Sequence, residues 1–451
     1  MSFPKYPAYK DSGVEWIGEI PIGWNLERVK CSVLECKNGV WGHEPQFDKD
    51  DITCVRVADF DREKLIISPL SLTVRNIKQE DVIGREVLFG DLLIEKSGGG
   101  EKQPVGCVVF YSLNHKSVCS NFIARMKISN SFVNKYLLYV HKFLYDSGVT
   151  VRSIKQTSGI QNLDQNSYLN EKIPVPPHPE QQAIANFLDR ECGKIDALIA
   201  EQEQLIALLA EKRQAVISHA VTKGLNPNAP MKDSGIPWIG IVPEGWEILS
   251  LNKVVRNFVD YRGVTPNKVE SGSPLITASC IKHGRIDHSI DPVFITEKEY
   301  NRRMTRGFPM AGDVILTTEA PLGEVAIVED ALMSPGQRMI LFKLDENMSN
   351  FYMRAYYLSN IGRQELRSRA SGSTASGIRA DRLRASAIPV PPLNEQKEIC
   401  AYIDRKTFAF ESLEQQIRYE LDLLKERRAA LISAAVTGKI DVRAQSKALA
   451  A

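Results

Sequence analysis

The sequence predicts a mixed α/β (α+β) protein: two globular α/β domains joined by two long antiparallel coiled-coil helices, in a repeat with pseudo-twofold symmetry. Two duplicated segments predict the repeat. Lys10-Asp-Ser-Gly returns as Lys232-Asp-Ser-Gly, 222 positions later, and Ile173-Pro-Val-Pro-Pro returns as Ile388-Pro-Val-Pro-Pro, 215 positions later. We call the second pair the proline boxes. A long helical pattern follows each proline box and predicts the two helices.

The size and composition are those of a soluble protein with more than one domain. A chain of 451 residues is too long for a single hydrophobic core. Its hydrophobic fraction of 43% and charged fraction of 25% are typical of globular proteins. No stretch of about 18 apolar residues occurs, and the first residues lack the apolar core of a signal peptide. We therefore expect a cytoplasmic protein with no membrane partner. The net charge of +2 neither requires nor excludes nucleic acid.

The sequence carries no motif for catalysis or metal binding. It has no Asn/Asp-Pro-Pro-Tyr/Phe motif of a methyltransferase and no Gly-x-x-x-x-Gly-Lys-Ser/Thr loop of an ATPase. The seven histidines show no metal-ligand spacing. The eight cysteines include no Cys-x-x-Cys pair, which predicts reduced thiols and neither disulfides nor zinc. We expect no catalytic residue, no metal and no cofactor in this chain.

Each Lys-Asp-Ser-Gly segment begins a leading box that continues as Trp-Ile-Gly and then Pro-x-Gly-Trp. Trp16, Trp24, Trp238 and Trp246 therefore repeat, although the residues between the boxes differ greatly. This repetition predicts packing residues that seat each insert on the helices. The second helical pattern ends in Val-Thr-Gly-Lys, much as the first ends in Val-Thr-Lys-Gly before the second leading box, so the repeat is effectively circular.

The two inserts are predicted to share one fold. Gly90-Asp-Leu-Leu-Ile and Gly312-Asp-Val-Ile-Leu lie at equivalent places, again 222 positions apart. Strand-like runs such as 105–111 and 325–328 are broken by Gly, Pro, Asn and Asp. Helical patches follow them in both inserts, which indicates mixed α/β structure.

Apolar residues recur at 3–4 spacing over residues 180–222 and 395–437, as in a coiled-coil seam. Neither stretch contains proline, and only Gly193 interrupts the first. Because the two patterns match in length, we expect the helices to pair with each other; the alternative is two amphipathic helices packed only on their own domains. The predicted seam and partner-binding residues are Ile184, Leu188, Ile195, Leu198, Leu205, Ile399, Ile403, Phe410, Leu413 and Leu424.

The boxes divide the chain into seven predicted segments. These are a leading segment (1–24), a first globular domain (25–172), a proline box with the central helix (173–224), a linker with the second leading segment (225–246), a second globular domain (247–387), a proline box with the C-terminal helix (388–440) and a tail (441–451).

Two segments of each insert carry the side chains that phosphate and base contacts need. One is the loop after the Gly-Asp strand (96–103, and the less basic 317–323). The other precedes the proline box (152–159 and 363–384). The candidate DNA-binding residues are Lys96, Ser97, Lys102, Gln103, Arg152, Lys155, Gln156, Thr157, Ser158, Arg369, Ser373, Thr374, Arg379, Arg382 and Arg384. The alternative for the arginines is a solvated helix face beside a flexible loop.

Together, the two Ile-Pro-Val-Pro-Pro-x-x-Glu-Gln segments, the two leading boxes and the two Gly-Asp segments resemble the specificity (S) subunit of Type I restriction–modification systems. The resemblance covers essentially the whole chain, in the same order. It implies that each insert is a target recognition domain that reads one half of a bipartite, asymmetric DNA sequence. It also implies a DNA-binding host-defence protein that is not itself an enzyme.

The resemblance further implies partners. The long helices would set the spacing of the half-sites and dock two methyltransferase (modification) subunits, and restriction subunits would join the complex. S-adenosylmethionine is expected in the methyltransferase partner, and ATP and Mg in the restriction partner. The alternative function is a coiled-coil scaffold with two protein- or glycan-binding domains and no DNA readout. It gives no reason for arginine-rich loops.

Overall fold

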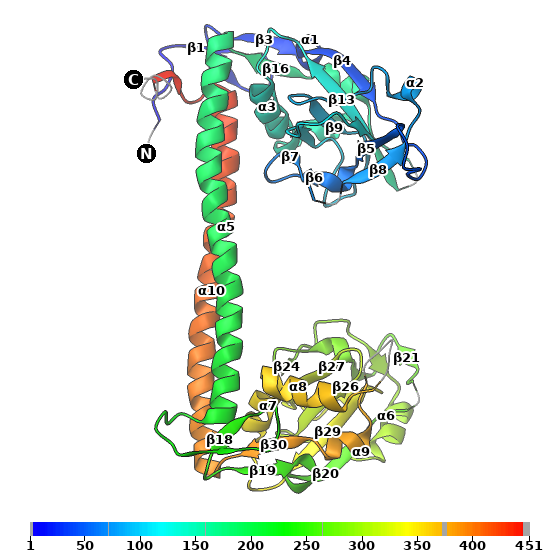
Figure 1. The fold of residues 1–451 in the computed structure, drawn as a ribbon, viewed down its shortest axis with the longest axis vertical. Helices are drawn as coiled ribbons and strands as arrows, with labels where there is room; N and C mark the ends of the chain where they lie inside the picture. Colours follow the sequence, from blue (N-terminus) through cyan, green and yellow to red (C-terminus); the bar gives the residue numbers. More distant parts are fainter. Residues whose placement is uncertain (1–2, 71, 158, 264, 372–376, 445–451) are drawn as a thin grey trace. The chain divides into compact units, whose positions relative to one another are not determined.

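Two helices of 46 and 44 residues follow the proline boxes: α5 (His178–Lys223) and α10 (Leu393–Val436). The computed structural model describes residues 3–70, 72–157, 159–263, 265–371 and 377–444. The chain divides into unit 1 (Met1–Gln202 with Tyr419–Ala451) and unit 2 (Glu203–Arg418) (Figure 1). Each unit contains one insert and part of both helices. The seven segments predicted from the boxes stay a prediction, since these units cut across both helices.

The two inserts share one mixed α/β fold, as predicted, built around a central sheet. In unit 1 the sheet order is β4-β13-β9-β11-β7-β6, and in unit 2 it is β20-β29-β26-β27. In both sheets the second strand lies antiparallel to its two neighbours, and the fourth lies antiparallel to the third. The strands are β4 (Val33–Asn38), β13 (Ile123–Ile128), β9 (Leu92–Glu95), β11 (Val108–Phe110), β7 (Ile66–Ile67), β6 (Phe60–Asp61), β20 (Val255–Asp260), β29 (Met339–Leu344), β26 (Val314–Thr318) and β27 (Leu322–Ile327).

Smaller sheets complete each unit and repeat in part. A parallel pair beside the central sheet recurs, as β12 with β5 in unit 1 and β28 with β22 in unit 2. A further antiparallel pair joins the start of each insert to its proline box, as β3 with β16 and β19 with β30. Their bounds are β12 (Val118–Cys119), β5 (Asp51–Val55), β8 (Thr73–Asn76), β28 (Ser334–Pro335), β22 (Ser273–Ile276), β25 (Phe294–Ile295), β21 (Lys268–Val269), β3 (Asn25–Arg28), β16 (Lys172–Val175), β19 (Glu247–Ser250) and β30 (Ala387–Val390).

The core of each unit lies between its central sheet, one insert helix and the ends of the two long helices. In unit 1, α3 (Asn134–Asp146) packs with Ile184 and Leu188 of α5 and with Ile432 of α10. In unit 2, α7 (Asn350–Leu358) packs with Ile399 and Ile403 of α10 and with neighbouring residues of α5. The helices therefore pack on their own domains and also pair with each other.

The leading boxes form β-hairpins, β1 (Tyr9–Asp11) with β2 (Glu19–Pro21) and β17 (Met231–Asp233) with β18 (Ile241–Pro243). The repeated Lys-Asp-Ser-Gly sequence makes the turn. The Asp11 carboxylate accepts a hydrogen bond from the Gly13 amide at 2.9 Å, and Gly13 has φ of 64°. The second box repeats this turn with an Asp233–Gly235 hydrogen bond of 3.0 Å. Asp and Gly are needed here because the carboxylate closes the turn and glycine tolerates positive φ.

The glutamate of each proline-box motif holds the tryptophan of a leading box. Trp24 Nε1 donates to Glu180 Oε1 at 3.1 Å in unit 1, and Trp246 Nε1 donates to Glu395 Oε2 at 3.0 Å in unit 2. Both indoles are 1% exposed. This confirms the packing role predicted for these two tryptophans.

The glutamine of each motif holds the insert helix. Gln181 accepts from the Val133 amide at 3.0 Å, just before α3, and donates to the Pro176 carbonyl at 3.0 Å. Gln396 makes the same two bonds in unit 2, to the Ser349 amide at 2.8 Å and the Pro391 carbonyl at 2.9 Å. The Glu-Gln pair thus ties each long helix to both its leading box and its insert.

In unit 1 the leading hairpin contacts the residues just after α10, which agrees with the circular repeat predicted from the sequence. Tyr9 Oη of the leading hairpin donates to the Gly438 carbonyl, just after α10, at 3.1 Å. A Cβ atom on Gly438 would lie 2.4 Å from Pro21, so only glycine fits there. An added Cβ on Gly438 would also lie 3.2 Å from the Trp24 ring. In unit 2, Gly224 follows α5, and an added Cβ there would lie 3.2 Å from the Trp246 ring.

Each Gly-Asp segment joins its central strand to the insert helix. Asp91 accepts from the Leu88 amide at 2.9 Å, and the Gly90 carbonyl accepts from Asn134 Nδ2 at 2.6 Å. In unit 2 the Asp313 carboxylate accepts from the Met310 amide at 2.8 Å, and the Gly312 carbonyl accepts from Asn350 Nδ2 at 3.0 Å. Gly90 and Gly312 have φ of 96° and 93°.

Equivalent ion pairs join the two helices in the two units. Arg428 Nε lies 2.8 Å from Asp196 in unit 1, and Arg213 pairs with Glu411 in unit 2. Residue numbers rise along one helix as they fall along the other, so the helices are antiparallel within each unit. Asp196 and Glu411 are 215 positions apart, as are Arg213 and Arg428. The ion pairs therefore repeat with the proline boxes.

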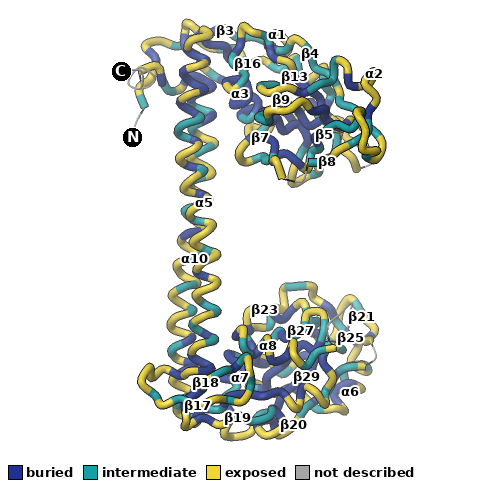
Figure 2. The backbone as a smooth tube through the Cα atoms, viewed as in Figure 1, coloured by how far each residue is buried: buried dark blue, intermediate teal, exposed yellow. Residues whose placement is uncertain are grey.

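The predicted seam was partly wrong. Leu198, Leu205 and Leu413 are 46%, 39% and 40% exposed. Ile195 is buried as predicted, and the other buried residues along this part of the helices include Ile199, Leu209, Ile417 and Leu421. Figure 2 shows exposed residues along much of the middle part of both helices. Leu198 and Leu205 each precede another apolar residue, so helical spacing alone is compatible with two adjacent rows of seam residues. Packing buries Ile199 rather than Leu198. Phe410 and Leu424 are half-buried.

His141 gives unit 1 a predicted dependence of stability on pH. This α3 side chain is fully buried beside the Tyr168 hydroxyl, 2.7 Å from Nδ1, and burial lowers its pKa from 6.5 to about 4. Between those values the unfolded chain binds a proton that the folded chain does not, so stability falls as pH falls. We expect a loss of about 2 kcal/mol from this residue between pH 7 and pH 5.

The variant His141→Gln retains a group that can bond Tyr168 and should lose less stability than the unchanged chain over the same interval. Urea unfolding at pH 7 and pH 5, followed in unit 1, measures both losses. Equal losses in the two proteins would contradict the assignment.

Candidate nucleic-acid interface

The first predicted contact segment of each unit lies where a central strand, β9 or β26, ends. In unit 1, β4 and β9 end where β13 begins, since Asn38 pairs with Ala124 and Glu95 with Ile123. In unit 2, β20 and β26 end where β29 begins, with Asp260 paired to Ile340 and Thr317 to Met339. We call this end of the strands in each sheet, where the loops leave it, the loop edge.

Unit 1 brings its two predicted contact segments together. β10 (Ser97–Gly98), from the glycine-rich loop, pairs with β15 (Ile160–Leu163), and β15 pairs with β14 (Ile154–Thr157) from the second segment. Ser97 Oγ donates to Asn162 Oδ1 at 2.7 Å. Two stretches more than fifty residues apart in sequence therefore form one surface at the loop edge.

The candidate residues of unit 1 differ in their contacts. Lys102, Gln103, Arg152 and Gln156 are exposed, which suits contacts to DNA. The Lys96 ammonium instead donates to Asn38 and Gln165 at 3.0 Å each and holds the end of β4 to α4 (Gln165–Leu169).

Lys155 is 75% exposed and lies 2.5 Å from Asp164. This hydrogen bond holds the pKa of the Asp164 carboxyl below its ordinary value. Thr157 contributes its backbone to β14, whereas Ser158 lies outside the described residues.

Unit 2 also brings its two segments together. Gly377 forms bridges with both Glu319 and Ser371, and the Ile378 amide donates to the Thr318 carbonyl at 3.0 Å. The next residue, Arg379, is exposed. Ser373 and Thr374 lie outside the described residues. The pairing of a strand-end loop with the segment before the proline box is thus common to the two units.

The predicted arginines of unit 2 have different environments. Arg369, at the end of α8 (Asn360–Arg369), pairs with Glu365, which is fully buried and also accepts from Trp238 Nε1 at 2.8 Å. This pair stabilises the fold. In α9 (Ala380–Arg384), Arg384 lies 4.6 Å over the Phe258 ring. Arg379, which follows Ile378 at the loop edge, is exposed, and the exposed Arg382 donates to the Arg369 carbonyl at 3.5 Å.

Three further arginines at the loop edge of unit 2 were not in the predicted set. Arg262 Nε donates to Asp260 at 2.9 Å, and Arg306 donates to the Asp260 carbonyl at 2.9 Å. Arg338 Nε lies 3.6 Å from Glu319. A usable signal existed, since Arg262 closely follows a strand and Arg338 directly precedes one. The sequence could not show that these separated residues meet at one edge.

The basic run from Arg302 to Arg306 is largely occupied by internal contacts. Arg303 is 5% exposed and donates from Nε to Ser334 Oγ at 3.0 Å, and burial lowers its pKa. Arg302 pairs with Glu299 at 2.6 Å within α6 (Glu297–Met304). Only Arg306 reaches the loop edge.

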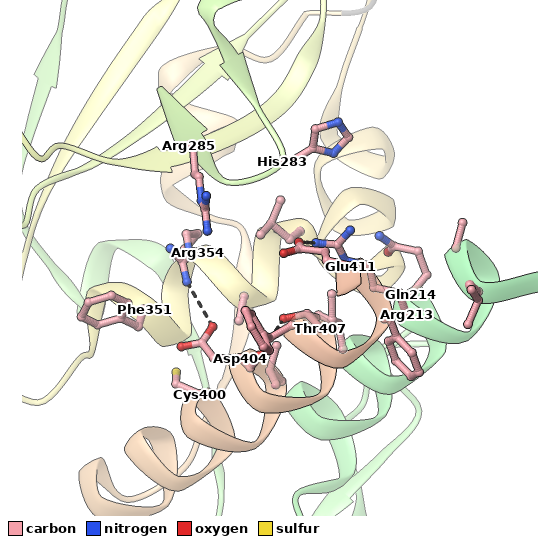
Figure 3. Close-up of a pocket in the computed structure, with 18 of the residues that line it drawn as sticks. Arg213, Gln214, His283, Arg285, Phe351, Arg354, Cys400, Asp404, Thr407 and Glu411 are labelled. Carbon is pink, nitrogen blue, oxygen red and sulfur yellow. Dashed lines mark hydrogen bonds and ion pairs between the residues drawn. The ribbon is translucent and has the colours of Figure 1, made fainter. Parts of the chain in front are cut away.

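A cavity of about 840 Å³ lies in unit 2 between α5, α7 and α10 (Figure 3). The turn between β23 (Ile281–Lys282) and β24 (Arg285–Ile286) covers one side of it. Its lining is mixed, with the Arg354–Asp404 ion pair at 3.5 Å and the exposed aromatic rings of Phe351 and Phe408. Such a lining suits contact with another protein surface.

Across the described ranges, no group of three or more His, Cys, Asp or Glu side chains could hold a metal ion. The eight cysteines are free thiols. In the part of the chain that the structure describes, no helix is both long enough and apolar enough to cross a membrane.

Comparison with known proteins identifies the family. The sequence model of the Type I restriction modification DNA specificity domain matches residues 88–207 and 243–423. A Methanocaldococcus jannaschii protein, provisionally named the type I restriction enzyme MjaX specificity subunit, is 26% identical over 435 residues, covering 95% of this chain and 96% of that protein. The EcoKI specificity subunit of Escherichia coli is 21% identical over 440 residues, covering 94% and 90%.

A solved structure shares the fold. It concerns complex assembly and conformational transition of the type I R-M system, and one of its chains superposes with a TM-score of 0.63 at 18% identity, covering 92% of this chain and 98% of that chain. Since the family model matches more than half of the residues, this chain belongs to the Type I restriction modification DNA specificity family.

Proposed function

We propose that this chain is the DNA-reading subunit of a Type I restriction–modification complex, in which each unit reads one half of a bipartite, asymmetric target. One observation carries this proposal: the hydrogen bonds of the Glu-Gln pairs, the leading hairpins and the Gly-Asp segments repeat in both units, while the side chains at the two loop edges differ. Unit 1 presents Lys102 and Gln103 there, and unit 2 presents Arg262 and Arg379. Arginine, lysine and glutamine are the residues that contact phosphates and base edges.

Two methyltransferase subunits are the proposed direct partners. Equivalent bonds recur in both units, so two identical subunits would meet equivalent surfaces. Exposed apolar residues on the long helices supply contact area, among them Leu208 at 52% and Phe408 at 72% exposure. The cavity of unit 2 is a further contact surface. In this proposal the long helices also set the spacing between the half-sites.

The remaining chemistry is assigned to the partners. S-adenosylmethionine belongs to the methyltransferase subunits, and ATP and Mg belong to restriction subunits that join the complex. This chain contributes sequence recognition without a catalytic residue. The scaffold alternative, with protein- or glycan-binding domains, is less favoured because it leaves the arginines of the loop edge unexplained.

A mobility-shift experiment tests the proposal on this chain assembled with its methyltransferase partner. Methylome sequencing of cells that carry the complete system first defines the methylated motif. We expect the assembled complex to bind a duplex with that motif at least roughly a thousandfold more tightly than an unrelated duplex. Equal affinity for both duplexes would refute DNA reading by this chain.

A further inference from the structure

Phe122 and Arg338 occupy the same position in the two units. In unit 1 the Lys96 amide donates to the Phe122 carbonyl at 2.7 Å, and in unit 2 the Thr318 amide donates to the Arg338 carbonyl at 2.8 Å. Lys96 and Thr318 are the equivalent residues of the Gly-Asp segments, six positions after each glycine.

A second pair of bonds confirms the equivalence. Ser120 lies two residues before Phe122, and Gly336 lies two residues before Arg338. The Ser120 amide donates to the Val55 carbonyl at 2.9 Å, and the Gly336 amide donates to the Ile276 carbonyl at 2.8 Å. The shared frame therefore holds these two backbone positions alike, immediately before β13 and β29.

Both side chains point into solvent at the loop edge, but their chemistry is opposite. Phe122 is 47% exposed, and the Arg338 side chain is 44% exposed. Phe122 neighbours Lys96 and Ser97, and Arg338 neighbours Thr318 and Glu319. A single frame thus displays an apolar ring in one unit and a guanidinium in the other, next to the segments proposed to contact DNA.

We propose that this position reads one base in each half-site: Arg338 contacts a guanine, and Phe122 contacts the methyl group of a thymine. The inference rests on the proposed function. Arginine paired to guanine O6 and N7 is the commonest specific contact in the major groove, and phenylalanine can pack against the thymine methyl.

The shared position favours bases over phosphates. A phosphate could hold Arg338, but it offers nothing to a phenyl ring. Base edges in the major groove offer a partner to both side chains. The ion pair with Glu319 uses Arg338 Nε. The two terminal nitrogens can then form the fork that a guanine accepts.

The test uses the complete complex with Arg338→Ala and Phe122→Ala, analysed by methylome sequencing and by competition binding. Arg338→Ala should make one guanine of a single half-site degenerate. The preference for guanine at that base should fall from roughly ten- to a hundredfold to about one. Phe122→Ala should make one thymine of the other half-site degenerate. Because both side chains are about half exposed, both variants should melt near the unchanged protein.

Matched control residues lie at the opposite end of the strands of the same sheets. Arg256, at the start of β20, and Phe89, before β9, are exposed. Arg256→Ala and Phe89→Ala should leave the methylated motif unchanged.

Several outcomes overturn the inference. An unchanged motif with uniformly weaker binding and a smaller salt slope for Arg338→Ala would identify a phosphate contact instead. Loss of complex assembly would identify a protein contact. An unchanged motif with unchanged affinity would show no role in recognition. Failure of the proposed function is distinct, because the unchanged complex would then show no bipartite motif at all.

Discussion

DNA binding by the assembled complex should weaken roughly ten- to a hundredfold at about 0.1 M salt when Arg379 and Arg382 are both replaced by alanine. Both residues are exposed, and Arg379 directly follows Ile378, whose amide bonds Thr318 at the loop edge of unit 2. If each contacts one phosphate, the slope of log affinity against log salt should become shallower by about two, because each contact contributes about 0.9. Titration of a fluorescent duplex at several salt concentrations measures the slope.

The structure sharpens the choice of residues for this experiment. Arg369 is left unchanged because it pairs with the buried Glu365, and Arg384 because it stacks on Phe258. The double variant Lys253→Ala with Arg256→Ala removes the same charge from exposed residues at the opposite end of β20. It should change the slope little. A similar slope for both double variants would show that net charge, rather than the loop edge, attracts the DNA.

Much of the fold was predictable because the frame repeats. The boxes are conspicuous in the sequence because several of their residues make specific bonds that recur in both units. Glu180 and Glu395 hold tryptophans, and Gln181 and Gln396 hold the insert helices. These bonds require the same residue types in both copies of the boxes. The boxes therefore allowed a shared fold to be predicted for two inserts of dissimilar sequence. The antiparallel helices followed from the matching apolar spacing.

The errors arose where one-dimensional pattern leaves a choice that only packing decides. Leu198 and Ile199 both satisfy helical spacing, and the structure buries Ile199. A cluster of arginines looked uniform in sequence, yet Arg369 serves a buried carboxylate and Arg379 faces solvent. The meeting of Arg262 with the segment at Ile378, more than a hundred residues later, depends on the order of the strands.

Replacing Trp246 with alanine should destabilise unit 2 by about 3–5 kcal/mol, the cost of removing a large aromatic side chain from a core. Three elements of unit 2 meet at this ring: the hairpin β17–β18, the start of α10 and the residue after α5. The indole is 1% exposed, its Nε1 bonds Glu395 at 3.0 Å, and Gly224 lies against it. Hydrogen exchange in β26 and β29 measures the loss.

The same substitution at Trp24 should cost a similar amount in unit 1, because Trp24 makes the equivalent bond to Glu180 and lies against Gly438, two residues after α10. Each variant should therefore lower exchange protection in its own central sheet. The matched control is Trp41→Ala, since Trp41 is 42% exposed and its ring lies 4.2 Å from the Arg75 guanidinium. Its cost should stay below about 1 kcal/mol. A small loss at Trp246 beside a large one at Trp24 would mean that the repeated bonds do not carry equal stability, and that the two copies of the frame have diverged in energy although not in geometry.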